Sequence, residues 1–572
     1  MITPITSARE RPNFMVYDLE WIPGEMKLRM VGVFDGERYR CYSSVGKFVE
    51  HELTHKNSGR WFYAHAGGLA DLQFVIPVLQ ARGYTIHGAL SGSSVIIARV
   101  SRAGRNWYFV DSFWLIRDSL RNIGKWVGIA KGNDDESVEF YRTASFLELR
   151  DYNELDCLIL YKGIQLFEDA LYELGGQLRM TQASCAMDLF RRRFLSREIR
   201  TSPAINVKAR EAYFASRVEV LATRCENAYY YDVNSSFPYA MTFPQPGEFL
   251  KQFHGPPTGS PEIWMGDATV EMPDGFLPPL PVRAGRRLFF PTGRWRGWYS
   301  NVDLELLESC GGTIHQVHES LSFQPMLDLR EYSLSLYELR KKSDGALKVV
   351  CKYLMNSLYG KFAESELKTE LVINPDEPQP GWTMLAPGVF NFDKVAKVPH
   401  MHVPIAVHVT AIGRRTLYNY MRPSVPEIHY CDTDGFSTMR TYPDGNELGD
   451  LKLEKYIRQG RFMQAKVYHI SGTDTSGKPA EIVRAKGFSR MTLEKFEKLL
   501  NFEEIEFTRM ARIRENARRG DFTPREYPMS KGIHRDAISK RSFYADGKSR
   551  PWGFDELNRL LLSRGQDGLQ AA

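Results

Sequence analysis

The spacing of apolar residues predicts an alternation of short strands and amphipathic helices along the whole chain. Strand patterns, in which apolar or aromatic residues lead up to a polar turn, cover the stretches 15–21, 61–65, 228–232 and 425–438. Helix patterns, with apolar residues three and four positions apart, cover the stretches 71–79, 151–160, 332–342, 346–358, 404–420 and 493–500. Polar residues with distinctive chemistry cluster where several of these strands end.

The last strand pattern contains Asp432 and Asp434, separated by a single residue. Gly435 tolerates backbone angles that other residues avoid, which predicts two short strands joined by a tight turn. Side chains at i and i+2 of an extended chain point to the same side, so the two carboxylates are expected to lean toward one spot. A cation between them would relieve their repulsion, and Mg²⁺ prefers such oxygen ligands. A solvated acidic turn is the alternative interpretation.

A third carboxylate ends the aromatic strand pattern 228–231. Asp232 is the last residue of this pattern, and Val233 begins the turn that follows. An acid at a strand end, with free backbone N–H groups just beyond it, can hold a metal on one side and a phosphate on the other.

A second group of polar residues lies near the N-terminus. Its members are Asp18, Glu20, Asp71, Tyr152 and Asp156. Asp18 and Glu20 share one side of a strand, and Tyr152 and Asp156 share one face of a helix. Four carboxylates and a phenol in one region of domain size are what a two-metal phosphodiester hydrolase requires, because acids hold the ions and another group orients the attacking water.

The helix pattern 346–358 carries a polar stripe. Lys348, Lys352 and Asn356 recur every four residues, and Arg340 ends the preceding helix pattern. Cationic side chains of this kind bind the phosphates of nucleoside triphosphates. A lysine-rich solvated face is the alternative, but a face that serves only solubility does not need the Tyr359-glycine pair at its end.

Composition restricts the class of protein. The chain has 572 residues, of which 43% are hydrophobic and 25% charged, so more than one globular domain is expected. No apolar run is long enough to cross a bilayer, and the first 12 residues lack a signal-peptide core, so no membrane partner is expected. The 7 cysteines form no CxxC pair, which argues against a zinc ribbon or a disulfide scaffold and favours a reducing compartment.

The net positive charge of the chain is concentrated near the C-terminus. Residues 509–550 contain 12 Lys or Arg and 5 Asp or Glu, a net charge of +7 in a chain whose total is +6. A basic stretch on a near-neutral protein suits a polyanionic partner, whereas a solvated charged surface is the alternative.

Taken in their order along the chain, the motifs resemble those of the family B DNA polymerases. The resemblance is specifically to the protein-primed branch of phages, linear plasmids and adenovirus-like viruses. The segments 18–20 and 152–156 and the region of Asp71 are similar to the three exonuclease motifs of that family. The segments 232–238, 352–360, 430–434 and 466–468 are similar to polymerase motifs A, B and C and to the Lys-x-Tyr motif that follows them.

The resemblance implies a fold of α/β and α+β type in several domains. A ribonuclease-H-like 3′–5′ exonuclease domain would occupy residues 1–175, and a palm-fingers-thumb polymerase domain residues 176–572. Within the latter, the expected parts are the palm at about 210–250 and 401–485, a first insertion at about 251–325, fingers at about 326–365, a second insertion at about 366–400, and a thumb with the basic tail at about 486–572. The Gly- and Pro-rich insertions predict loops and short strands.

The resemblance also assigns roles. Asp232, Asp434 and the backbone of Val233 would hold two Mg²⁺ ions per active site, with Mn²⁺ as a substitute, and Asp432 would support them. The metal ligands of the exonuclease would be Asp18, Glu20, Asp71 and Asp156, with Tyr152 orienting water. Further residues would contact the DNA or the incoming dNTP: Arg340, Lys348, Lys352, Asn356, Tyr359, Phe237, Val233, Lys466 and Tyr468. Expected partners are template and primer DNA, dNTPs and a separate terminal protein that supplies the priming hydroxyl.

The chain departs from the family pattern at several places. Ala66 follows His65 where Asn is usual, and Trp21 and Ala70 stand where relatives grip single-stranded primer. We therefore expect proofreading that is chemically intact but holds a frayed end weakly. The linker motif Tyr-x-Gly-Gly is replaced by Tyr-Phe-Ala-Ser at 213–216, which leaves coordination of the two sites open.

Other functions remain open from the sequence. The alternatives are a family B polymerase that uses an ordinary primer or none, a stand-alone nuclease whose C-terminal half binds DNA, and a nucleic-acid-binding or capsid-associated protein without catalysis. Lack of an Arg-rich leader favours a cytoplasmic location, in a bacterial host if a phage encodes the chain.

Overall fold

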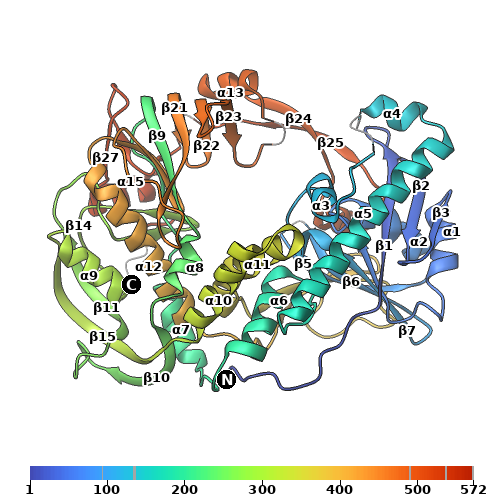
Figure 1. Ribbon diagram of the computed structural model, residues 1–572, viewed down its shortest axis with the longest axis horizontal. Helices are drawn as coiled ribbons and strands as arrows, with labels where there is room; N and C mark the ends of the chain where they lie inside the picture. The colour runs from blue at the N-terminus through green and yellow to red at the C-terminus, as the bar shows by residue number, and fades with distance from the viewer. Residues whose placement is uncertain (93, 133–136, 489–490, 535–536, 570–572) are drawn as a thin grey trace.

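The computed structural model describes residues 1–92, 94–132, 137–488, 491–534 and 537–569. Two bodies, each built on a large sheet, lie at opposite sides of the molecule (Figure 1). They are joined along one side by helices α6 (Gln182–Leu189), α7 (Pro203–Glu211), α10 (Asp328–Lys342) and α11 (Gly345–Ser357). No helix in these ranges is both long and apolar enough to cross a membrane.

The N-terminal body is a mixed sheet with helices on its faces. Its strands are β1 (Phe14–Ile22), β2 (Lys27–Phe34), β3 (Tyr39–Tyr42), β4 (Trp61–Ala64), β5 (Thr85–Ser91), β6 (Ser94–Arg102) and β7 (Arg105–Asp111). Its helices are α1 (Val45–Glu52), α2 (Asp71–Ala81), α3 (Leu120–Val127), α4 (Val138–Thr143) and α5 (Phe146–Glu173), with a short turn η1 (Ser112–Trp114). The pairs β1–β4 and β4–β7 are parallel, and most side chains of β1 are buried, as expected for a central strand. Helix α5 starts earlier than the pattern at 151 predicts, because Ser145 and Glu148 form a capping box.

The second body contains a seven-stranded antiparallel sheet, which we call the central sheet. Its order is β23-β22-β21-β9-β20-β19-β8. The strands are β8 (Val218–Val220), β9 (Arg224–Val233), β19 (Ile428–Asp432), β20 (Gly435–Thr438), β21 (Leu451–Gln464), β22 (Val467–Asp474) and β23 (Pro479–Ala485). The accompanying helices are α8 (Ser236–Ala240), α9 (Asn301–Ser309) and α12 (Val403–Met421), with η2 (Phe190–Phe194), η3 (Tyr359–Ala363) and η4 (Arg422–Ser424) as short turns. The buried side chains of α12 form an apolar core with the sheet.

The first insertion is more regular than its composition suggests. It forms a four-stranded sheet, with a hairpin beside it, from β10 (Gln245–Phe253), β11 (Ile263–Met272), β12 (Val282–Ala284), β13 (Arg287–Phe289), β14 (Gly293–Ser300) and β15 (Thr313–Met326). The expectation of loops and short strands was wrong here because some glycines serve close packing rather than turns. A Cβ at Gly266, within β11, would lie 2.9 Å from the carbonyl oxygen of Glu319 on β15.

The second insertion joins the N-terminal sheet. Strands β16 (Leu367–Ile373), β17 (Thr383–Ala386) and β18 (Val389–Val395) extend it to ten strands in the order β17-β18-β16-β5-β6-β7-β4-β1-β2-β3. The pairing sets Ile373 opposite Ile86. Because hydrogen-bonded strands move together, we infer that this insertion and the N-terminal body form one unit.

The C-terminal region bridges the two bodies and then returns to the second. Its elements are α13 (Leu493–Leu500), β24 (Ile505–Met510), α14 (Ile513–Arg519), β25 (Glu526–Lys531), β26 (Ser542–Phe543), β27 (Ser549–Arg550) and α15 (Phe554–Ser563). Strands β24 and β25 run along the top of Figure 1 toward the N-terminal body. There Gln73 on α2 donates to the carbonyl of Ala511 (2.8 Å) and accepts from Asn516 (2.8 Å).

Part of the positive charge of the stretch at 509–550 is paired or buried within the chain. Three of its arginines form ion pairs: Arg509 with Glu515, Arg525 with Asp521, and Arg550 with Glu556. Arg541 is fully buried. Arg535 and Asp536 lie outside the described residues. The positive surface open to a polyanion is therefore smaller than the sequence count suggests.

Candidate active sites

The central sheet brings Asp232 and Asp434 together. Strands β9 and β20 pair with Asp232 opposite Gly435, and the N–H of Val233 donates to the carbonyl of Asp434 (2.9 Å). The two carboxyl groups lie close enough for each to change the pKa of the other. A Cβ at Gly435 would lie 2.9 Å from an oxygen of Asp232, so only glycine permits this approach. The predicted turn and the convergence of these acids are both present.

Burial and mutual repulsion raise the pKa values of both carboxyl groups above the usual range for aspartate. Burial raises the pKa of Asp434 to about 7, with the charge of Asp232 as the next cause. Burial also raises the pKa of Asp232 to about 6, followed by the charge of Glu454. Lys455 and Lys466 offset this effect only in part, because both pKa values stay raised. The donor set therefore fits a divalent metal.

Asp432 has a different environment. Its carboxylate accepts from the Nζ of Lys466 (2.5 Å) and from the hydroxyl of Tyr430 (3.2 Å). Tyr468 lies beside Tyr430, with ring centroids 5.2 Å apart. Lys466, predicted to touch the primer end, is thus placed against an acid of the turn. A hollow of about 490 Å³ opens beside it and is also lined by Arg484, which the sequence analysis did not single out.

Several predicted nucleotide contacts surround the acid pair. Arg340 donates to the hydroxyl of Ser235 (3.2 Å) in the turn after Asp232. The rings of Phe237 and Tyr359 stack with centroids 4.4 Å apart and an interplanar angle of 29°. The charge of Asp434 is among the causes that raise the pKa of Tyr359, after burial and Tyr213, so this stack adjoins the acids. These residues come from α8, α10 and η3, and they meet only in the folded chain.

The polar stripe of α11 is exposed. Lys348 lies 3.9 Å from Asp344 in a solvated ion pair, and Lys352 is also exposed. Asn356 lines a hollow of about 660 Å³ that α11 forms with the β5–β6 turn and β16. The stripe is therefore accessible to a ligand.

The N-terminal acids also converge. Asp71 accepts a hydrogen bond from the N–H of Leu19 (3.1 Å), which draws the start of α2 to β1. Asn153 donates to Asp18 (2.9 Å) and to Glu20 (3.0 Å). Burial raises the pKa of Asp18 to about 7, with the charge of Asp71 as the second cause. Burial likewise raises the pKa of Asp71 to about 7.

The remaining members of this cluster lie on α5. Asp156 forms an ion pair with Lys131 (3.4 Å), whose Nζ also lies 5.2 Å from the ring centroid of Tyr152. The hydroxyl of Tyr152 lies 3.4 Å from that of Tyr141. Lys131 and Asn153 were missed in the sequence. Asn153 directly follows Tyr152, whereas Lys131 belongs to no pattern that could have singled it out.

Two side chains near the departures from the family pattern have partners within the chain. Both ring nitrogens of His65, which precedes Ala66, are engaged, by Ser112 (3.0 Å) and by the carbonyl of Asp118 (2.8 Å). Trp21 packs against Phe74 with ring centroids 5.1 Å apart. The weak hold on a frayed strand stays a prediction.

Neither cluster encloses an ion by protein groups alone. Within the described ranges, no three His, Cys, Asp or Glu side chains are grouped closely enough to hold a metal. Mg²⁺ commonly takes one or two carboxylates and completes its shell with water and substrate phosphates. The carboxylate pairs fit this mode of binding.

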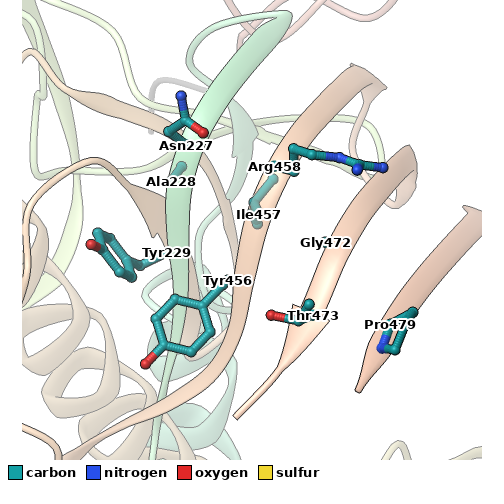
Figure 2. Close-up of a pocket in the computed structure, with 9 residues that line it drawn as sticks. All are labelled: Asn227, Ala228, Tyr229, Tyr456, Ile457, Arg458, Gly472, Thr473 and Pro479. Atoms are coloured by element: carbon teal, nitrogen blue, oxygen red, sulfur yellow. The ribbon is translucent and has the colours of Figure 1, made fainter. Parts of the chain in front are cut away.

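Another hollow on the central sheet has a different character. It measures about 410 Å³ and spans four neighbouring strands, with the rings of Tyr229 and Tyr456 at one side (Figure 2). No acid lines it, so it does not belong to the catalytic cluster.

Comparison with known proteins places these clusters in context. A family model described as "DNA polymerase type B, organellar and viral" matches residues 141–381. The chain is 29% identical over 388 residues to a probable DNA polymerase of Neurospora intermedia, covering 60% of this chain and 39% of that protein. It is 26% identical over 350 residues to the DNA polymerase of Streptococcus phage Cp-1, covering 55% and 59%. It spans 31–41% of the length of the relatives from Neurospora intermedia, Podospora anserina and Ascobolus immersus.

The fold is similar to a solved structure. Phi29 DNA polymerase complexed with primer-template DNA and incoming nucleotides superimposes with a TM-score of 0.73 at 18% identity, covering 91% of this chain and 100% of that one. The predicted fold class, an exonuclease-type domain followed by palm, fingers and thumb, is confirmed.

Proposed function

We propose that this chain, of which residues 141–381 match the model of organellar and viral type B DNA polymerases, is a member of that family in its protein-primed branch and adds dNTPs to a 3′ or protein-linked hydroxyl on a DNA template. The observation that carries this proposal is the convergence of Asp232 and Asp434 beside the Phe237–Tyr359 stack. A carboxylate pair can hold the cations that nucleotide addition requires, and the adjacent stacked rings can bind the sugar and the nascent base pair.

The side chains around the pair have separate roles in this proposal. Arg340, at the turn after Asp232, binds the triphosphate, and the exposed Lys352 joins it there. Phe237 lies under the sugar, and Tyr359 borders the nascent base pair. Lys466 neutralises Asp432 and stiffens the acidic turn beside the primer end.

The proposal includes divalent cations. Asp232, Asp434 and the backbone carbonyl of Val233 would hold Mg²⁺ at the palm, and Asp18, Glu20, Asp71 and Asp156 would hold it at the N-terminal site. When bound, the ions activate the attacking oxygen and offset charge on the phosphate. Mn²⁺ takes the same oxygen ligands.

We also propose that the N-terminal cluster removes mispaired nucleotides. Asn153 orients Asp18 and Glu20, while Lys131 holds Asp156 and adjoins Tyr152, which is placed to orient water. A stand-alone nuclease remains the rival, but it leaves the second acid pair and the aromatic stack without a role.

We also propose how this protein initiates synthesis. A terminal protein would provide a side-chain hydroxyl for the first nucleotide, and the replicated genome would be that of a phage or linear element. An ordinary primer is the alternative, since both supply the same attacking group.

The proposal is tested with two substrates in parallel. Purified protein is expected to extend a DNA primer on a template with Mg²⁺ and dNTPs. It is also expected to transfer dAMP from α-labelled dATP to a hydroxyl of a candidate terminal protein, with release of pyrophosphate. Lack of any extension would contradict polymerase activity. Extension of the DNA primer without a protein-linked product, with terminal protein from the same element, would contradict protein priming alone.

Replacing Phe237 with valine is expected to weaken discrimination between dNTPs and rNTPs by about tenfold, because a smaller side chain leaves room for the 2′-hydroxyl. The ratio of kcat/KM for dATP to that for ATP measures this effect. Phe237→Tyr, which keeps the ring, is the matched control. Unchanged discrimination in the valine variant would place the sugar elsewhere.

A further inference from the structure

The C-terminal segment 538–550 passes around the edge of the central sheet. Strand β8 is the last strand of that sheet, and it pairs with β19 so that Val218 lies opposite Asp432. The N–H of Thr223 donates to Gly547 (3.0 Å), and a single bridge joins Ala222 to Lys548. The segment thus covers an edge that would otherwise be open.

Two cations of this segment are inserted beneath β8. Lys540 donates through Nζ to the carbonyl oxygen of Val218 (2.8 Å). Arg541, fully buried, donates to the hydroxyl of Ser549 (2.8 Å) and to the carbonyl of Phe276 (2.8 Å). Both side chains therefore fix backbone or neighbouring groups rather than face solvent.

These cations join a buried ionic network. Glu219 lies 2.5 Å from Arg217 and 3.9 Å from Arg541, and all three are buried. With Lys540, three cations surround one carboxylate. One oxygen of Glu219 and one guanidinium nitrogen of Arg541 have no hydrogen-bond partner in the described part of the chain. Such an unbalanced buried cluster is costly compared with an apolar one, which indicates a role beyond stability.

The network is connected to the acidic turn through the backbone. Thr433, between the two acids, has a left-handed φ of 67°, and its N–H donates to the carbonyl oxygen of Arg217 (2.9 Å). A residue held in this conformation depends on its surroundings. Arg217 and Val218 therefore fix the turn, and the C-terminal cations fix Arg217 and Val218.

The same segment also contacts the opposite face of the strand pair. Phe543 packs with the aromatic cluster that includes Tyr430 and Tyr468. Tyr430 in turn donates to Asp432. The segment therefore contacts both faces of the sheet beside β19, the strand that carries Asp432.

We propose that Lys540 and Arg541 are positioning residues for nucleotide addition, because they hold the Asp432–Asp434 turn in place from behind the sheet. This inference rests on the proposed polymerase function. It assigns to the C-terminal segment a part in the palm active site.

The test compares Lys540→Met with Lys548→Met. Both changes remove a lysine charge from the same segment, but Lys548 is 79% exposed. Lys540→Met is expected to lower kcat for primer extension about tenfold or more, since small displacements of a reacting centre have effects of this size. KM for dNTP and exonuclease cleavage are expected to change less than about twofold, because the triphosphate contacts and the N-terminal site are untouched. Lys540→Arg, which keeps a donor, should recover most of kcat.

Hydrogen exchange provides a measure that does not depend on synthesis. Amides of residues 428–436 are expected to exchange at least about tenfold faster in Lys540→Met than in Lys548→Met, while those of β1 are unchanged. An unchanged kcat, or parallel losses of synthesis and exonuclease activity, would overturn the proposal. If the wild-type protein extends no primer, the polymerase function fails, whereas the exchange rates still decide whether Lys540 holds the turn.

Discussion

Replacing Asp434 with asparagine is expected to reduce nucleotide addition more than about 100-fold. Loss of a residue that only orients a metal ligand costs about 10–100-fold, and a direct ligand should cost more. Asparagine keeps the size of the side chain and its contact with Asp232 but cannot supply the charge. The raised pKa of Asp434, to about 7, reflects burial and the charge of Asp232, which Lys466 offsets only in part, and a bound metal would supply the remaining positive charge.

Primer extension under single-turnover conditions measures this loss, and cleavage of single-stranded DNA by the same preparation shows that the protein is folded. Asp376→Asn, a change at an exposed acid of the second insertion, is the matched control. If exonuclease activity fell together with synthesis, one site would serve both reactions, and the division into two sites would be wrong.

Local patterns were sufficient to predict the parts of the palm site that lie close in sequence. The tight turn at Asp432 and Asp434 and the helix break before α11 are found where the pattern places them, and the strand that carries Asp232 ends one residue later, at Val233. Each depends on interactions within a few residues, such as the side-chain alternation of a strand or the freedom of glycine at Gly435.

Features that depend on distant partners could not be predicted in this way. The strand β16 pairs with β5, almost 300 residues earlier, and no signal in either strand specifies the other. Likewise Lys131 becomes a partner of Asp156, and Lys466 a partner of Asp432, only when separate elements meet. For the same reason, a charge count of the basic stretch does not reveal that Arg541 is buried beside Glu219. Sequence patterns thus identify reactive groups, whereas the fold determines which of them interact.

The double change Asp18→Asn with Glu20→Gln is expected to reduce exonuclease cleavage more than about 100-fold and to leave primer extension within about twofold. As at Asp434, a residue that binds the metal directly should cost more on removal than one that only orients a ligand, for which the loss is about 10–100-fold. The amides are chosen because their oxygens can still accept the two hydrogen bonds from Asn153. Asp151→Asn, an exposed acid on the same helix as Asp156, is the matched control.

This variant should also alter the pH dependence of stability. The pKa of Asp18 rises from 3.8 to about 7 in the folded protein, so the native state holds a proton that the unfolded chain has released. Wild-type stability is therefore lost as pH rises between these values, and the neutral variant avoids this loss. Measured without divalent cations, the Tm of the variant relative to wild type should increase from pH 4 to pH 7. Added Mg²⁺ should raise the Tm of the wild type more than that of the variant, because the variant keeps only the acid pair Asp232 and Asp434. A Tm difference independent of pH would show that Asp18 and Glu20 are charged and compensated without a metal, and would remove the physical basis for a cation at this site.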